Sequence, residues 1–327
     1  MNRPKLSVLN ALGLGYEAVV RALWVLLVPL GLDFFFWLGP HISIHTLFER
    51  LIVAMGQTAL DPELQQSWDE VRRFMSEVGN NVNLLSLLAT DFIGIRLLPI
   101  PTLKAFELPQ SSEQELAQVG QANLIVIDSA AQAFVIGSGL LVLGLLVGSL
   151  FLTLIADRVR IGEARRSLPR RVVYNWLRLA LFAVMLFAFY FFVGVPFMLA
   201  VTIASLIHVA LGFLVILAGW TVTFWLLVLL SFVVYAIALR EDGVLLAIWH
   251  SANVVRRNLL STFGLVLLSN LIVAGTAVIW QSVEVSWLGN VLAIVGNAFV
   301  GSGLVAASFL FYQDRYEAWQ VLGVSTK

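Results

Sequence analysis

The sequence predicts an all-α polytopic membrane protein with six transmembrane helices. Apolar residues make up 60% of the 327 residues and charged residues only 12%, whereas soluble domains average about 45–50% and about 25%. Residues 179–239 contain no Asp, Glu, Lys or Arg. The chain has no cysteine, which excludes a disulfide scaffold. Its 20 Lys and Arg balance 20 Asp and Glu, so no basic excess can neutralise nucleic-acid phosphates. We therefore expect membrane lipid, and no nucleic acid, among the partners.

Six stretches are long and apolar enough to span a membrane. A span needs about 20 residues to cross about 30 Å of hydrocarbon, where lipid offers the backbone no hydrogen-bond partners. As one helix, the charge-free residues 179–239 would be about three times as long as the hydrocarbon core is thick. They are therefore expected to form a hairpin of two helices that turns between Val195 and Gly212. In chain order the spans are residues 18–38, 130–156, two helices within 179–239, 259–280 and 287–312.

Arginines determine the predicted orientation, because Lys and Arg are enriched in cytoplasmic loops. Seven arginines lie between Arg158 and Arg178, and three more precede the fifth span. Those loops are expected in the cytoplasm, and six spans then place both termini there too. We expect a prokaryotic plasma (inner) membrane protein in three parts: residues 1–40 with the first span, an extracytoplasmic helical segment at 41–129, and a five-helix bundle at 130–327.

Several shorter helices are also predicted. In the outer segment, residues 47–55 and 60–78 show helical spacing, and residues 84–98 indicate a helix on the membrane surface because Asp91 and Arg96 would be costly inside lipid. Residues 243–258 indicate an interfacial helix with Leu245 and Trp249 on the apolar face and His250 on the polar face. Residues 6–20 are expected to form another.

The outer segment opens with His41, His45 and Glu49. Their spacing of four residues would align them on one face of a helix, where they could bind a metal ion. The alternative is that they are polar groups near lipid headgroups. No cofactor is expected elsewhere.

Five polar residues within the spans could line a cavity or form contacts between helices. Asp33 lies near the outer end of the first span, which favours an interhelical or interfacial partner over a proton or cation relay. The others are neutral groups that could line a pore or hold helices together. The set is Asp33, His208, Asn270, Asn290 and Asn297.

The arginine-rich loop could bind anionic lipid headgroups, although its composition is also explained by the topology signal alone. The candidate residues are Arg158, Arg160, Arg165, Arg166, Arg170 and Arg171. Glycines at helical spacing, such as Gly144 with Gly148 and the Gly289, Gly296 and Gly303 series, indicate close helix packing within the bundle or between copies.

Two motifs near the C-terminus carry a family resemblance. The first comprises Glu241-Asp242-Gly243, Ala247, Ser251 and Arg256-Arg257-Asn258 before a long apolar helix, and the second is Phe311-Tyr312-Gln313-Asp314-Arg315. In these motifs, residues 240–317 resemble uncharacterised bacterial six-helix integral membrane proteins related to the membrane domain of glycerophosphodiester phosphodiesterases. The resemblance implies a six-helix bundle with cytoplasmic termini. It implies no catalytic residues, because the phosphodiesterase domain of those relatives is a separate soluble barrel.

No P-loop, GxSxG, HExxH or EF-hand motif occurs in the sequence. We therefore expect a non-enzymatic integral membrane scaffold or accessory subunit that contacts lipid and a protein partner or a second copy. The alternatives are a transporter or lipid-handling permease with a cavity among the last five helices, and an enzyme acting through His41, His45 and Glu49.

Overall fold

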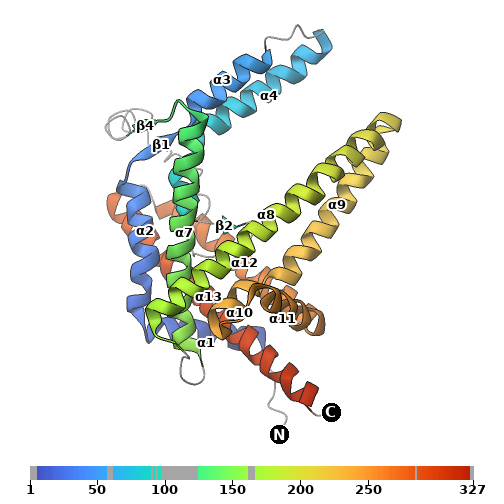
Figure 1. Ribbon diagram of the computed structural model, residues 1–327. Coiled ribbons are helices and arrows are strands. Elements are labelled where there is room, and N and C mark those ends of the chain that lie inside the picture. Colours follow the sequence, from blue (N-terminus) through green and yellow to red (C-terminus); the bar gives the residue numbers. More distant parts are fainter. Residues whose placement is uncertain are drawn as a thin grey trace.

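The computed structural model describes residues 6–56, 62–89, 91–92, 95–96, 124–160, 166–283 and 286–324. This part of the chain is predominantly helical, as predicted, and its sheets are two short strand pairs (Figure 1). Five helices are long and apolar enough to cross a membrane, and a bent helix pair at the N-terminus would make a sixth.

The N-terminal pair consists of α1 (Val8–Val20), followed by the 3₁₀ helix η1 (Leu23–Leu26) and α2 (Leu27–Leu38). The two halves differ in direction by 90°. The helix expected for residues 6–20 is confirmed, but one continuous helix over residues 18–38 is wrong. The backbone of Ala22 is not helical, with φ −143° and ψ 54°, and the helix is therefore interrupted immediately after Arg21.

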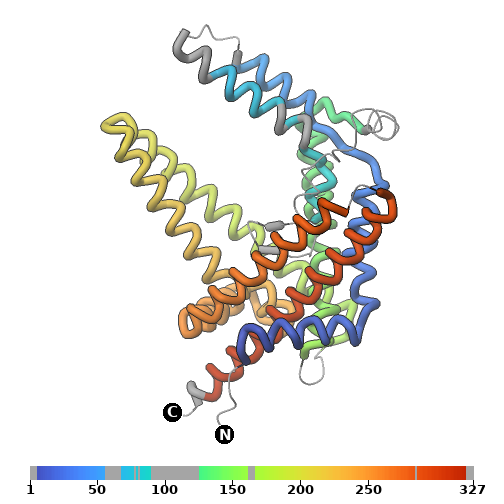
Figure 2. Tube along the Cα trace, turned by 180° about the vertical axis from the view of Figure 1, so that it is seen from behind, coloured from blue at the N-terminus to red at the C-terminus, as the bar shows by residue number. Residues whose placement is uncertain are grey.

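α1 lies against α13 (Trp287–Val324), and both views show the two helices side by side (Figure 2). The contact is close because glycines face it. A Cβ on Gly15 would lie 2.5 Å from the Ala307 nitrogen and 2.6 Å from the Gly303 oxygen, and Tyr16 packs on Gly303. The backbone nitrogen of Leu6 also donates to Asp314 Oδ2 at 3.1 Å. The small residues on α13 thus allow α1 to pack closely against it.

The segment between α2 and α7 begins and ends in one parallel strand pair. β1 (His41–Ser43) pairs with β4 (Leu124–Val126), immediately before α7 (Ala130–Val159). Between them, α3 (His45–Gly56) and α4 (Pro62–Asn81) form a hairpin that projects from the body (Figure 1). The two helices expected here are confirmed. Residues 107–121, whose polar composition predicts a loop leading into a helix, lie outside the described residues.

A single helix over residues 84–98 is wrong. Only the 3₁₀ helix η2 (Leu84–Leu88) forms, and it is followed by the antiparallel strands β2 (Asp91–Phe92) and β3 (Ile95–Arg96). Asn83 starts η2, because its Oδ1 accepts from the backbone nitrogens of Leu85 and Ile42. Buried leucines then hold η2 against Ile42 and α7. This tertiary packing overrides the helical pattern.

The charge-free run forms α8 (Leu168–Ile207) and α9 (Val209–Leu230), which turn at His208 within the expected interval. The hairpin diverges from α7 in both views (Figures 1 and 2). A bend then leads to α10 (Val233–Arg240), α11 (Val244–Arg257) and α12 (Leu259–Val283).

The main core lies at the arginine-rich end of the bundle. Phe151, Val233, Ile237 and Phe309 are fully buried there. α10 packs against α7, α8, α11 and α13. Its C-terminal end is therefore surrounded by other helices, and the candidate site lies there.

Candidate functional site: an arginine cluster around Glu241

Glu241 ends α10 in a left-handed conformation, with φ 56° and ψ 35°. It is the only non-glycine residue with positive φ in the described part of the chain. Glycine normally takes this position at the end of a helix, and another residue costs about 1–2 kcal/mol. The contacts of the Glu241 side chain must therefore outweigh this cost.

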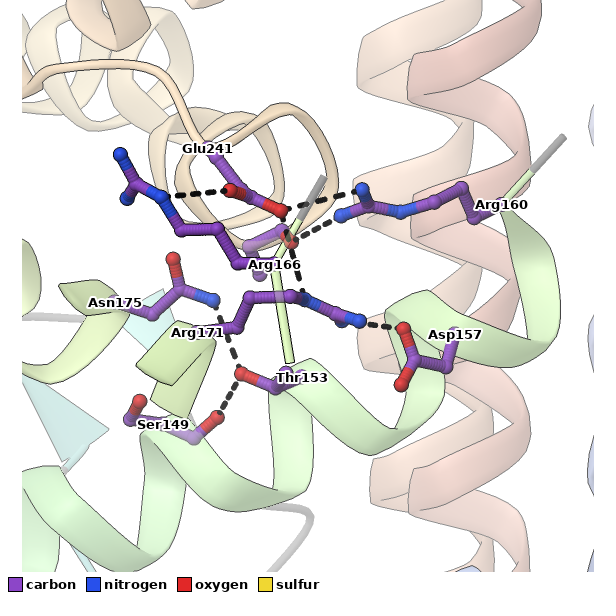
Figure 3. Close-up of polar contacts among 9 residues, drawn as sticks. Ser149, Thr153, Asp157, Arg160, Arg166, Arg171, Asn175 and Glu241 are labelled. Carbon is purple, nitrogen blue, oxygen red and sulfur yellow. Dashed lines mark hydrogen bonds and ion pairs between the residues drawn. The ribbon is translucent and has the colours of Figure 1, made fainter. Parts of the chain in front are cut away.

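Three arginines converge on the Glu241 carboxylate (Figure 3). Arg160 at the end of α7 has Nη1 3.4 Å from Oε1, and Arg171 in the first turn of α8 has Nε 3.6 Å from the same oxygen. Arg166 has Nε 4.0 Å from Oε2. Arg171 also pairs with Asp157 on α7. One carboxylate thus joins the ends of α7, α8 and α10.

The centre of this cluster is buried inside the protein and does not lie on its surface. The side chain of Glu241 is 5% exposed and that of Arg171 is 2% exposed. Burial lowers the pKa of Arg160, and neighbouring Arg171 lowers it further, while Glu241 and Asp157 oppose that shift. Three guanidinium groups face two carboxylates, which leaves one positive charge in excess. Arginines are poor proton donors because they stay charged at physiological pH, so the cluster is suited to binding charge and holding geometry.

A buried polar network extends the cluster along the α7–α8 contact (Figure 3). Asn175 Nδ2 donates to Thr153 Oγ1 at 3.0 Å, and Thr153 Oγ1 donates to the Ser149 carbonyl oxygen at 2.6 Å. Ser149 Oγ donates to the Val172 carbonyl oxygen at 2.8 Å. All three polar side chains are fully buried, so they fix the register of the two helices.

A second cluster of polar and charged side chains is centred on Asp242. His250 Nδ1 lies 2.8 Å and Arg240 Nε 3.3 Å from Asp242 Oδ2. Arg240 also stacks on Tyr316 of α13, with 3.7 Å between the guanidinium carbon and the ring centroid. The helix predicted for residues 243–258 forms as α11. His250, which the sequence assigns to its polar face, is buried beside Asp242, whereas Trp249 on the apolar face is 60% exposed.

Three of the predicted lipid-binding arginines contact Glu241, and Arg166 does so at the longest distance, 4.0 Å. Arg160 and Arg171 engage carboxylates of the chain itself, so the buried Arg171 is not presented to a headgroup. Arg158 and Arg170 are exposed, and Arg158 stacks over Trp24 at 5.0 Å. Arg165 lies outside the described residues.

The predicted histidine and glutamate series does not lie on one helix. His41 is in strand β1, whereas α3 begins at His45, because pairing with β4 keeps the chain extended through Ser43. His45 Nε2 and Glu49 Oε1 lie 3.0 Å apart. Over the described ranges, no three His, Cys, Asp or Glu side chains are grouped to hold a metal ion.

The five polar residues within the predicted spans are dispersed. His208 caps α9, where its Nδ1 accepts from the Ala210 nitrogen at 3.1 Å, at the tip of the α8–α9 hairpin (Figure 1). Asn270 is exposed and donates to its own helix at Val266. Asn290 is partly buried near the start of α13, and Asp33 and Asn297 are buried.

Sequence reasoning missed Glu241 as the centre of the cluster. Glu241 belongs to the Glu241-Asp242-Gly243 motif, and an acid two residues after the end of a long apolar run was a usable signal. Asp157, directly after the second predicted span, carried a similar signal. Arg160 ends α7, Arg166 precedes α8 and Arg171 lies in its first turn, so only the fold shows that they share one partner.

The fold and site define an all-α protein with several long apolar helices, whose ends meet in a buried ionic cluster. The chain belongs to the family described as domain of unknown function DUF7847, whose model matches residues 113–316, more than half of the chain. The match spans α7 to α12 and most of α13, and so includes the whole cluster. Comparisons with curated proteins and with solved structures gave no match.

Proposed function

We propose that the protein is a non-enzymatic scaffold or accessory subunit of a prokaryotic plasma membrane. It crosses the membrane six times, and both termini lie in the cytoplasm. The observation that carries this proposal is the α8–α9 hairpin, which stands away from the rest of the bundle (Figures 1 and 2). Only 6% of the most apolar window of α8 is buried, against 56% for α7. The hairpin therefore offers a large apolar surface to a partner helix.

The hairpin is closed by its own small residues, so its helices stay together without further support. Ser205 packs on Gly212, and the ring of Phe197 packs on Gly219. The outward side chains remain free, including Phe192 at 74% and Trp220 at 72% exposure. Lipid can cover these faces alone, but a paired helix would add close packing between side chains.

The other glycine-rich faces are filled from within the chain. A Cβ on Gly144 would lie 2.7 Å from the Leu88 carbonyl oxygen of η2. Gly296 receives the Trp280 ring, and Gly303 receives Tyr16. These positions serve internal packing, so the partner-binding surface is assigned to the hairpin.

A transporter or permease would need its polar residues to face a shared cavity. His208 lies at the hairpin tip, and Asn270 bonds to its own helix. These two candidate residues therefore do not face one shared cavity, which favours the scaffold.

Single-cysteine crosslinking tests the proposal, because the chain has no native cysteine. Phe192→Cys and Trp220→Cys would be treated with a membrane-permeant bis-maleimide in native membranes. Phe134→Cys on α7, where Phe134 is 75% exposed, is the matched control. We expect a discrete adduct from the hairpin variants, at twice the chain mass for a second copy or at another mass for a different protein. The scaffold proposal fails if the hairpin variants give no adduct beyond that of F134C.

A further inference from the structure

A basic and aromatic stripe runs along the first turns of α8, outside the Glu241 cluster. Arg170, Tyr174 and Arg178 follow one another at intervals of four residues and so share one helix face. Arg170 and Tyr174 are exposed, and Arg178 is partly buried. Arg178 directly precedes the charge-free run that begins at Leu179.

Two guanidinium groups gather on the Tyr174 ring. The guanidinium carbon of Arg166 lies 4.1 Å from the ring centroid, and that of Arg178 lies 5.8 Å from it. Both distances are within the range of cation–π attraction. Since both lie near the same ring, the two guanidinium carbons can be at most about 10 Å apart.

Among the described residues, Arg170 and Arg178 have no carboxylate partner, whereas Arg166 has a long contact with Glu241. Within the described ranges, neither Arg170 nor Arg178 forms an ion pair, and Arg178 Nη1 is a buried nitrogen with no hydrogen-bond partner. Arg166 is only loosely engaged, because its 4.0 Å contact with Glu241 is the longest of the three and its side chain is 39% exposed. The stripe can therefore accept an anion without breaking the core of the cluster.

We propose that Arg166, Tyr174 and Arg178 bind the phosphate of an anionic phospholipid, with Arg170 at the edge of the site. A guanidinium group binds phosphate through paired N–H donors. Leu177 and Leu181, each 52% exposed, lie beside the stripe and give acyl chains an apolar contact. This apolar neighbour favours a lipid over free phosphate.

Lipid titration followed by native mass spectrometry tests the site on the full chain. Phosphatidylglycerol is the anionic probe and phosphatidylcholine the zwitterionic one. Each arginine near a membrane surface contributes about a fivefold change in affinity. We expect Arg178→Gln to bind phosphatidylglycerol about fivefold more weakly, and the R166Q/R178Q double variant about 25-fold more weakly. Tyr174→Phe, which keeps the ring, should bind as the wild type does.

Arg256→Gln is the matched control, because Arg256 is an exposed arginine on α11 that stacks on no ring among the described residues. If R178Q fails to fold, Arg170→Gln and Tyr174→Ala test the same stripe. An equal loss in R256Q would overturn the proposal, because it would show diffuse attraction only. Unchanged binding in R178Q, or equal affinity for inorganic phosphate alone, would also overturn it.

Discussion

Neutralising Glu241 tests whether the arginine cluster stabilises the fold. The change is Glu241→Gln, which keeps the side-chain shape and removes the charge. Arg171 would keep Asp157, and Arg160 would keep the Ala238 carbonyl oxygen at 3.3 Å, but both would lose their shared carboxylate. Removing one partner from a buried ion pair costs about 3–5 kcal/mol. Arg166 is partly exposed and adds little, so we expect a loss of about 3 kcal/mol in the free energy of unfolding.

The left-handed backbone of Glu241 separates the charge from the conformation. Glu241→Ala loses the charge and keeps the unfavourable φ of 56°, whereas Glu241→Gly loses the charge and relieves the strain. E241G should therefore be about 1 kcal/mol more stable than E241A, although both are less stable than the wild type. This order reverses the usual effect of glycine, which destabilises regular structure relative to alanine.

The assay is reversible unfolding in mixed micelles, followed by the fluorescence of the 10 tryptophans. Glu317→Gln is the matched control, because Glu317 is exposed and bonds only to Gln313, one turn away on its own helix. E317Q should stay within about 0.5 kcal/mol of the wild type. A loss below about 0.5 kcal/mol in E241Q, or an equal loss in E317Q, would refute the role assigned to the cluster.

Three further predictions concern other contacts. Gly15→Ala should destabilise the protein by about 2 kcal/mol, because the new Cβ meets backbone atoms of α13. Gly13→Ala, whose Cβ would have nothing within 4 Å, should instead raise the free energy of unfolding by up to about 1 kcal/mol. Thermal unfolding compares the two variants. Ser251 Oγ donates to the Leu229 carbonyl oxygen at 2.7 Å and accepts from the Phe232 nitrogen at 3.2 Å, so Ser251→Ala should cost about 2 kcal/mol. Ser308→Ala, which removes a bond within one helix, should be nearly neutral in the same assay. Burial lowers the pKa of His41 below its ordinary value of 6.5, so the unfolded chain takes up the proton first and stability should fall as pH drops below 6.5. His41→Gln should reduce that slope in unfolding experiments run at several pH values, and an unchanged slope would contradict the assignment.

The sequence predicted the parts of the fold that depend on local composition. Long apolar runs identified α7, the α8–α9 hairpin, α12 and α13, because burial in lipid requires continuous hydrophobic length. The packing of η2 on Ile42 and α7, and of α1 on α13, joins residues far apart in the chain, so local periodicity could not show that the predicted helices are interrupted beside these contacts. For α11 the pattern assigned His250 to the polar face, but it could not show that this side chain is buried against Asp242 and Tyr316.

The candidate site was only partly visible for the same reason. The sequence identified a cluster of arginines, but it could not show which of them face a carboxylate and which remain free. Arg171 and Arg170 are adjacent in the chain and differ completely in environment, since one is buried against Asp157 and the other is exposed. A helix turns about 100° per residue, so neighbours face different surroundings. Similarly, the link between Glu241 and Arg160 spans a large sequence separation that no local motif reports.

The β1–β4 strand pair has a consequence for how the protein can vary. Its parallel pairing brings His41 beside Leu124, and Ser43 O accepts from the Ile127 nitrogen at 3.0 Å, so the segment between them leaves and rejoins the bundle at one point. Loop-closure entropy rises slowly, by about 0.6 kcal/mol for each doubling of length. The α3–α4 hairpin, which projects from the body (Figure 1), can therefore lengthen, shorten or be exchanged at little cost to the helices below, whereas η2 is fixed by its contacts with Ile42 and α7. The strand pair thus makes the hairpin, and not the whole segment, the replaceable part of the chain.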